Sequence, residues 1–220
     1  MAEIDTLLLD LDDTIVREAQ YLSGVVQKFV SQIGFWSDSV DMVLAEIPRI
    51  RRERVDVLGS ILSDLGLMSS ANHDALFEIF CCHDMALDPV EGAQDLFDMA
   101  EERDWKVVVL TNGVPEAQSA KWRGLRLAGS ERAVFMPARL YGGDKPNVAA
   151  FDAAIAIAGT DWSTVLAVGD KYENDLAVPR SRGARTFLVK DDGSGDGSLA
   201  GEVGTLEQLV ISIRRGVENG

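Results

Sequence analysis

The sequence predicts an α/β protein: a three-layer core with a parallel sheet between helices, joined to a small all-helical domain. Two observations carry this prediction. From residue 88 onward, short apolar runs alternate with helical patterns, which is typical of a parallel sheet covered by helices on both faces. Between residues 16 and 87 the chain shows only helical periodicity, which indicates an inserted helical unit.

The first strand organises the rest of the prediction. Its apolar run, residues 7–9, is too short for a helix and suits a strand buried on both faces. Three carboxylates follow at once, Asp10, Asp12 and Asp13, and Thr14 closes the group. Because like charges repel, a divalent cation is the simplest way to neutralise such a group. An Asx-type turn, in which the Asp side chains only bond the local backbone, explains the same run about equally well.

The inserted unit is predicted to contain four helices. Their ranges are Glu18–Ile33, Ser37–Ile47, Pro48–Leu65 and Ser70–Met85. Each range places apolar side chains at helical spacing, and Gly34 and Gly66 provide stops after the first and third. Pro48 is expected to break the helical pattern, because proline lacks the N–H that a helix interior needs.

The remaining elements alternate between helix and strand. Predicted helices are Pro89–Arg103, Pro115–Leu127, Asn147–Ala158, Asn174–Arg182 and Leu206–Arg214. Predicted strands are Lys106–Leu110, Ala133–Met136, Thr164–Val168 and Thr186–Val189. A Gly-rich loop covers residues 141–146, and a flexible Gly/Ser/Asp loop is expected after the last strand. We therefore assign residues 1–15 and 88–220 to the α/β core and residues 16–87 to the helical domain.

The composition is that of an ordinary globular protein, with 220 residues, 46% hydrophobic and 26% charged. A formal net charge of -15 repels polyphosphate, so we expect no nucleic acid polymer as a partner. The cysteines, Cys81 and Cys82, are adjacent, and with His83 they lack the paired spacing of a zinc site. We expect a cytoplasmic protein that does not interact with membranes, because no leader or membrane-spanning run is visible. The oligomeric state stays open.

Polar side chains follow the predicted strands where each one ends. They are Asp10 and Asp12 after the first strand, Thr111 after the strand at 106–110, Lys145 in the Gly-rich loop, and Asp170 and Asp175 after the strand at 164–168. The carboxyl ends of parallel strands lie at one edge of a sheet, so these residues are expected to meet in one crevice. Taken singly, Thr111 is explained as a helix cap and Lys145 as a solvated loop lysine. Their joint arrival at one edge favours a functional site.

The set of residue types suits phosphoryl transfer. Carboxylate oxygens, completed by water and a substrate phosphate, are how proteins usually hold Mg²⁺. A carboxylate can attack phosphorus and form an acyl phosphate. A hydroxyl and an ammonium then balance charge on the transferring phosphoryl group.

These segments resemble the four signature motifs of the haloacid dehalogenase superfamily, in the family's order and across the whole chain. The motifs are Asp10-Leu11-Asp12-Asp13-Thr14, Thr111-Asn112-Gly113, Lys145-Pro146, and Gly169-Asp170 with Asn174-Asp175. The helical insertion stands where members with a helical cap after the first motif carry it. The resemblance implies a Rossmann-like core, a helical cap at residues 16–87, Mg²⁺ as the cofactor, and hydrolysis of a small phosphorylated metabolite.

The resemblance also implies roles for the first motif. Asp10 would be the nucleophile that forms an aspartyl phosphate, and also a Mg²⁺ ligand. Asp12 would protonate the leaving alcohol and then activate water, while its backbone carbonyl binds the metal. Asp13 has no implied chemical role, and Thr14 would shape the turn.

The other motifs receive roles in the same way. Thr111 would hydrogen-bond the phosphoryl group, with Asn112 nearby, so both are candidate substrate-binding residues. Lys145 would neutralise charge on the nucleophile and the phosphate. Asp170 would bind Mg²⁺, and Asp175 would ligate it directly or through water, or orient Lys145.

Asp12 separates branches of this superfamily. The dehalogenases proper carry no carboxylate at that position, because a halide leaving group needs no proton. Asp12 therefore favours hydrolysis of a phosphate ester. The alternatives are a phosphoryl-accepting signalling domain, a related phosphomutase, and a 2-haloacid dehalogenase.

Basic residues in the inserted unit have two interpretations. Arg49, Arg51, Arg52 and Arg54 form a dense basic patch that either recruits an anionic substrate tail or is a solvated helix face. Arg17, close to the first motif, is a similar candidate.

Overall fold

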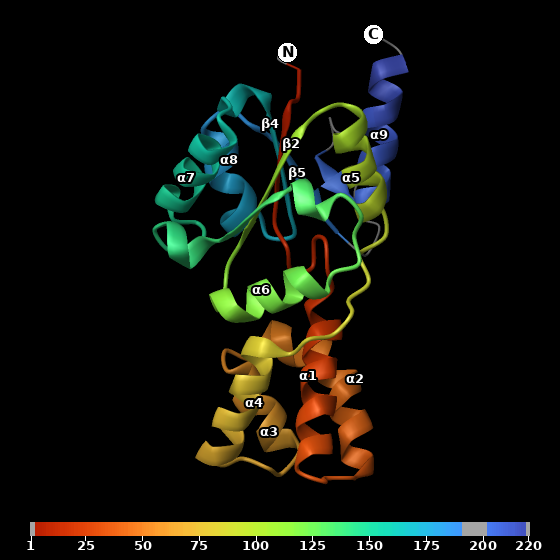
Figure 1. The fold of residues 1–220 in the computed structure, drawn as a ribbon, viewed down its shortest axis with the longest axis vertical. Helices are drawn as coiled ribbons and strands as arrows, with labels where there is room; N and C mark the ends of the chain where they lie inside the picture. Colours follow the sequence, from red (N-terminus) through yellow and green to blue (C-terminus); the bar gives the residue numbers. More distant parts are fainter. Residues whose placement is uncertain (1–2, 191–201, 219–220) are drawn as a thin grey trace. The chain divides into compact units, whose positions relative to one another are not determined.

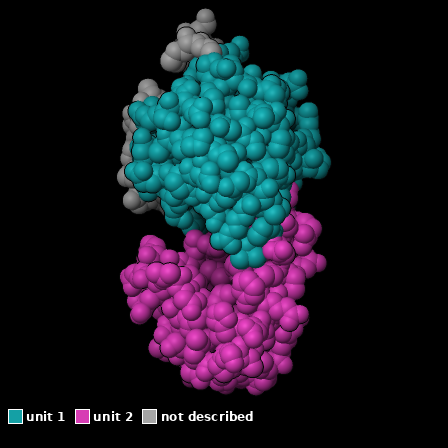
Figure 2. Space-filling model, turned by 90° about the vertical axis from the view of Figure 1, so that its left-hand side faces the viewer, with its two compact units in different colours: residues 1–17, 88–115, 125–220 teal, residues 18–87, 116–124 magenta. Residues whose placement is uncertain are grey.

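The computed structural model describes residues 3–190 and 202–218 (Figure 1). The chain divides into two compact units, which have different colours in Figure 2. The first unit contains Met1–Arg17, Asp88–Pro115 and Leu125–Gly220. The second contains Glu18–Leu87 and Glu116–Gly124. Within the described ranges, no helix is both long enough and apolar enough to span a membrane.

A six-stranded parallel sheet forms the centre of the first unit, in the order β3-β2-β1-β4-β5-β6. The strands are β1 (Thr6–Leu9), β2 (Lys106–Thr111), β3 (Val134–Pro137), β4 (Val165–Gly169), β5 (Arg185–Val189) and β6 (Val203–Gly204). All residues of β1 and β4 are buried, which explains why these strands are apolar apart from Thr6 at the start of β1. The predicted α/β class with a parallel sheet is confirmed.

Helices cover both faces of this sheet. Figure 1 shows α7 (Val148–Ala158) and α8 (Ala177–Ser181) on one face, and α5 (Ala93–Glu102) and α9 (Leu206–Glu218) on the other. The side of α7 that carries Phe151 is buried against apolar strand residues, as its helical spacing of apolar side chains predicts. The sheet and its two helical layers form the Rossmann-like core.

The register of β1 sets the position of the residues that follow it. Leu9 pairs with Val109 in β2 and with Val168 in β4. The N–H group of Asp10 continues the ladder by donating to the Val168 carbonyl over 3.0 Å. The ends of three adjacent strands therefore lie level at one edge of the sheet.

The second unit is helical. Its helices are α1 (Glu18–Gln32), α2 (Asp38–Glu53), α3 (Val57–Asp64), α4 (Ser70–Cys82) and α6 (Pro115–Gly124). The predicted helical domain ended at residue 87, whereas the contacts of the structure add residues 116–124 to this unit. The contacts of α6 with this unit include the pair of Lys121 with Glu18 and the hydrogen bond from the Leu87 N–H to the Gly124 carbonyl over 2.8 Å. That this unit acts as a cap stays a prediction.

The predicted break at Pro48 is wrong. The α2 helix runs through this residue to Glu53, and the next helix begins only at Val57. Val43, Ile47 and Ile50 keep one buried face across the proline, so burial of that face outweighs the missing N–H.

Other boundaries also differ from the prediction. The helix expected from Pro89 begins at Ala93, because Pro89 forms a β-bridge with Val16. The helix expected at Asn174–Arg182 is a π-helical turn, η4 (Tyr172–Leu176), continued by α8. The two-residue strand β6 was not predicted. The Gly/Ser/Asp loop expected after the last strand lies largely outside the described residues.

Candidate active site

Asp10 stands at the end of β1, in the middle of the sheet, and is 9% exposed. A tight turn follows, in which the N–H groups of Ile15 and Val16 both donate to the Leu11 carbonyl, over 2.9 and 3.1 Å. Asp13 takes the left-handed conformation at φ 58°, which Asp tolerates better than most residues. Asp12 lies in this turn, and its side chain is half-buried.

Lys145 reaches two of the predicted carboxylates. Its Nζ atom lies 2.6 Å from Oδ1 of Asp10 and 2.7 Å from Oδ1 of Asp175. All three side chains are at most 10% exposed, so the lysine is a buried bridge between two buried acids. The alternative interpretation of Lys145, as a solvated loop lysine, does not fit this geometry.

Burial shifts the protonation of this group. It raises the pKa of Asp10 to about 8, although the Lys145 ammonium lowers it; the Asp175 carboxylate raises it further. Burial favours the neutral amine of Lys145, but the carboxylates of Asp10 and Asp175 outweigh that effect and raise its pKa. Lys145 is therefore the cation that these two buried acids share.

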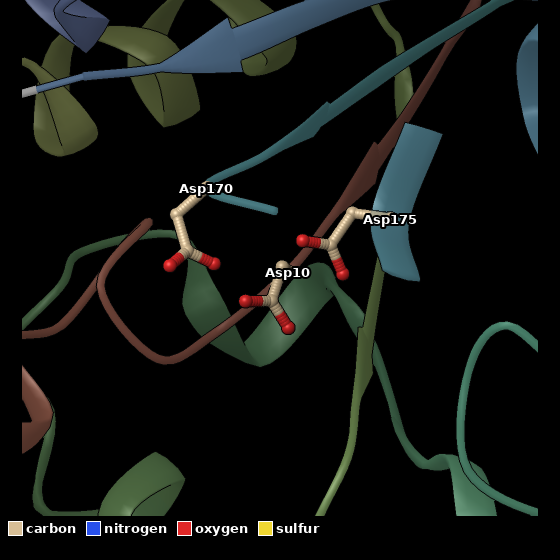
Figure 3. Close-up of side chains that lie close together, drawn as sticks. All are labelled: Asp10, Asp170 and Asp175. Atoms are coloured by element: carbon tan, nitrogen blue, oxygen red, sulfur yellow. The ribbon is translucent and has the colours of Figure 1, made fainter. Parts of the chain in front are cut away.

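Asp170, after β4, completes an acidic centre. One carboxylate oxygen each from Asp10, Asp170 and Asp175 lies within 4.8 Å of the other two, and Figure 3 shows these side chains together. Burial raises the pKa of Asp170 to about 6, although the Lys171 ammonium lowers it. Oδ1 of Asp170 is buried and accepts no hydrogen bond from the residues that the structure describes. Such a buried acceptor is suited to receive a metal ion or a water molecule.

The donor set fits Mg²⁺. Three carboxylates, one of them with a buried, unsatisfied oxygen, offer the hard oxygen ligands that this ion takes. Asp10 and Asp170 are the candidates for direct contact. Both oxygens of Asp175 are already engaged: Oδ1 by Lys145, and Oδ2 by the Lys171 N–H over 3.0 Å. Of the roles predicted for Asp175, orienting Lys145 and binding the metal through water fit this arrangement best.

Asp175 comes this close only because residue 169 is glycine. A Cβ atom added to Gly169 would lie 2.4 Å from Cβ and 2.7 Å from Oδ2 of Asp175. The signal for this contact was present in the sequence as the pair Gly169-Asp170 at the end of a strand.

Thr111 and Asn112, at the end of β2, make different contacts. Thr111 ends β2, is 1% exposed, and its hydroxyl donates to the Asn112 carbonyl over 3.3 Å. The Asn112 side chain holds the backbone of Lys145: its Nδ2 donates to the Lys145 carbonyl over 2.9 Å, and its Oδ1 accepts the Lys145 N–H over 2.6 Å. Substrate binding by either residue stays a prediction. The structure shows that Asn112 holds the backbone of the loop that carries Lys145.

The sequence analysis missed Asp144. Its Oδ1 accepts the N–H of Gly113 over 3.3 Å, and its Oδ2 accepts from Nε of Arg139 over 2.8 Å. Its position next to Lys145, in a loop with two glycines, was the available signal.

The basic patch of the second unit is paired in part. Arg49 contacts Glu46 and Glu53 on its own helix, which matches the solvated-face interpretation. Arg51 pairs with Glu18, which also binds the buried Lys121 over 2.8 Å. Cys81 and Cys82 are free thiols at the end of α4.

Comparisons with known proteins agree with this fold. A family model described as haloacid dehalogenase-like hydrolase matches residues 4–181. No curated protein sequence matches the chain. Among solved structures, the chain is similar to the HAD-hydrolase YfnB from Bacillus subtilis bound to magnesium (17% identity, TM-score 0.64, 86% of this chain and 87% of that chain).

Two further structures are similar over nearly all of the chain. One is a 2-haloacid dehalogenase from Pseudomonas syringae pv. Tomato DC3000 (24% identity, TM-score 0.61, 97% of this chain and 99% of that chain). The other is a HAD family hydrolase from Deinococcus radiodurans R1 with bound phosphate and sodium (18% identity, TM-score 0.65, 100% of this chain and 97% of that chain).

The parallel sheet with an acidic centre at its carboxyl edge defines a Rossmann-like α/β enzyme core. The family match covers most of the chain and narrows the assignment from a fold class to a family. The chain belongs to the haloacid dehalogenase-like hydrolases, and the predicted superfamily is confirmed.

Proposed function

We propose that this hydrolase is a Mg²⁺-dependent phosphatase that releases phosphate from a small phosphorylated metabolite. The single observation that carries the proposal is the buried bridge of Lys145 between Asp10 and Asp175, beside the unsatisfied oxygen of Asp170. Such a centre has the groups needed to bind a phosphoryl group and neutralise its charge.

The proposed reaction has two steps. The Asp10 carboxylate attacks phosphorus, the bond between phosphorus and the ester oxygen breaks, and Asp12 gives its proton to the leaving alkoxide. Asp12, now a carboxylate, then takes a proton from water. The water oxygen attacks the phosphorus of the aspartyl phosphate, and the bond between phosphorus and the Asp10 oxygen breaks. The products are an alcohol, inorganic phosphate and the original Asp10 carboxylate. Thr111 and Lys145 hold the phosphoryl oxygens in both steps.

Mg²⁺ would supply charge neutralisation at the phosphoryl group and the acidic centre. Asp10, Asp170 and the Asp12 carbonyl would hold it, with Asp175 contributing through water. The magnesium and the phosphate bound to two structural neighbours are consistent with this proposal, but those ligands belong to those proteins.

Dehalogenation is the second candidate, because a 2-haloacid dehalogenase is among the structural neighbours. Asp12 argues for the phosphatase, since an alkoxide leaving group gains from a proton donor and a halide does not. Release of halide from a 2-haloacid, without release of phosphate from any ester, would favour the dehalogenase.

The decisive experiment measures phosphate release from p-nitrophenyl phosphate and from a panel of phosphorylated metabolites. Wild-type protein should turn over repeatedly with Mg²⁺ and stop with EDTA. Asp10→Asn should abolish turnover while the fold survives. Asp13→Asn is the matched control: it makes the same chemical change three residues away, at a left-handed position that Asn tolerates, and should keep most of the activity. Retained turnover in Asp10→Asn rejects the proposed nucleophile.

The partner proposed from these arguments is a small metabolite. The net charge of -15 disfavours nucleic acid polymers and anionic membrane surfaces alike. A cytoplasmic location stays a prediction, which cell fractionation with an antibody tests.

A further inference from the structure

The loop that carries Lys145 is built from residues that do not fix its whole shape by themselves. Gly142 and Gly143 have φ values of 113° and 122°, a region open to glycine and rarely to other residues. Glycine-rich backbone is conformationally free, yet the Lys145 ammonium must reach two carboxylates within hydrogen-bond distance. Hydrogen bonds within the loop, such as the one from Nδ2 of Asn147 to the Gly142 carbonyl over 2.7 Å, fix part of its shape, and contacts from outside the loop add to them.

Hydrogen bonds of Asn112 and Gly113 connect this loop to the end of β2. Asn112 makes two of them with the backbone of Lys145. The third runs from the N–H of Gly113, which follows Asn112, to Oδ1 of Asp144, which precedes Lys145. Two consecutive residues on one segment thus bind two consecutive residues on the other.

Asp144 is itself held from the loop's other end. Nε of Arg139 donates to Oδ2 of Asp144 over 2.8 Å, and Arg139 lies in the short 3-10 helix η2 (Ala138–Tyr141) just before the two glycines. The side chains are 49% and 35% exposed, and ion pairs this open to water add little to stability. The effect of the pair is geometric. It links η2 to Asp144 at the far end of the loop and orients Oδ1 of Asp144 toward the Gly113 N–H.

We propose that Arg139 and Asp144 are positioning residues, which hold the Thr111–Gly113 segment against the Lys145 loop. This inference rests on the proposed function, because it assigns the pair to the site that would bind the phosphoryl group. Neither side chain touches the reacting atoms. Asp144 acts by fixing the peptide of Gly113, so that Asn112 keeps its two bonds to Lys145 and the ammonium stays beside Asp10.

Amide hydrogen exchange by NMR, with steady-state kinetics, tests the proposal in the full chain loaded with Mg²⁺. In Asp144→Ala, exchange of the Gly113 amide should accelerate by about tenfold or more, as expected when a local opening becomes easier. The Asn112 side-chain amide, which donates to Lys145, should accelerate too. The kcat for p-nitrophenyl phosphate should fall about tenfold with KM changed less than about twofold, because misplaced groups cost rate.

Two further variants separate positioning from a local structural role. Asp144→Asn keeps an oxygen acceptor for Gly113 and should restore protection and kcat to within about threefold of wild type. Arg139→Gln should accelerate exchange of the Asn112 amide in the same direction, by a smaller factor. Arg132→Gln is the matched control, because it removes an equally exposed arginine–carboxylate pair, with Glu101, elsewhere in the unit; it should change neither quantity.

The outcomes distinguish this inference from the proposed function. Unchanged Asn112 exchange and unchanged kcat in both Asp144→Ala and Arg139→Gln overturn the positioning role and leave the phosphatase intact. If exchange of the Asn112 amide accelerates but the protein hydrolyses no phosphate ester, the positioning role is supported and the proposed phosphatase function is rejected. Accelerated exchange together with a kcat defect supports both.

Discussion

The Nζ atom of Lys145 lies 2.6 Å from Oδ1 of Asp10, although 135 residues separate them along the chain. The same ammonium lies 2.7 Å from Oδ1 of Asp175. One buried cation therefore serves two buried carboxylates, so that its removal leaves both without their counter-charge.

Replacing Lys145 should damage both activity and stability. In Lys145→Met, kcat for p-nitrophenyl phosphate should fall by about 100-fold or more, the usual cost of losing a donor to developing charge. The free energy of unfolding at pH 8 should fall by about 3 kcal/mol, because two buried acids lose their cation. Kinetics and urea unfolding measure these effects. Lys106→Met, which changes an exposed lysine on β2, should stay within about 0.5 kcal/mol of wild type; an equal loss in both variants would contradict the prediction.

The acidic centre should make the metal-free protein less stable as pH rises. The folded pKa of Asp10 is about 8 and that of Asp170 about 6, against an ordinary value of 3.8 for both. The folded state thus binds these protons more tightly than the unfolded state. The stability they contribute is fully present below about pH 4 and is lost as pH rises through 6 and 8.

Mg²⁺ should reverse this loss, because the ion competes with protons for the same oxygens. Thermal unfolding at pH 5.5 and pH 8, with and without the ion, measures the effect. At pH 8 and a Mg²⁺ concentration of about 100 times Kd, Tm should rise by about 5 to 10 °C. The rise at pH 5.5, at the same concentration, should be clearly smaller. Equal shifts at the two pH values would argue against carboxylates as the ligands.

A second buried ion pair gives an asymmetric prediction. Lys121 is 1% exposed and pairs with Glu18, which is 22% exposed and also contacts Arg51. Glu18→Gln removes the carboxylate from a fully buried ammonium and should cost about 3 kcal/mol of unfolding free energy. Lys121→Met leaves Glu18 its arginine and should cost less, about 2 kcal/mol. Glu101→Gln, from the exposed pair with Arg132, should cost under about 0.5 kcal/mol. Urea unfolding ranks the three, and the reverse order for the first two would refute the argument.

The central strands were predictable because their residues act locally. The runs at residues 7–9 and 108–110 are buried, so each is a continuous apolar stretch in the centre of the sheet that ends where the chain becomes polar. Pro48 misled the analysis, because its local effect on the helix was outweighed by Val43, Ile47 and Ile50 on a buried face. Strand β6, at two residues, is too short to leave a periodic signal.

The site was predictable as a set of residues, but its contacts were not. Parallel topology places Asp10 and Asp170 at one edge whatever the side chains do. The sequence does not show which carboxylate oxygen contacts Lys145, or that the Asn112 side chain binds the Lys145 backbone. Both contacts join residues that are far apart in the chain. The grouping of α6 with the helical unit has the same origin, since Lys121 and Glu18 are 103 residues apart.

Gly169→Ala should disable the site through Asp175. The new Cβ would lie 2.4 Å from the Asp175 Cβ, a backbone-anchored atom that cannot move aside without shifting η4. Asp175 would then lose its hold on Lys145, and kcat should fall by about tenfold to 100-fold. Gly24→Ala provides the matched control: its Cβ also meets an atom at 2.4 Å, but that atom is Sδ of the flexible Met85 side chain. Since alanine favours the helix and Met85 can change rotamer, Gly24→Ala should keep kcat within about twofold of wild type. Equal kcat in the two variants would show that the close approach of Asp175 to the strand end is not needed for turnover.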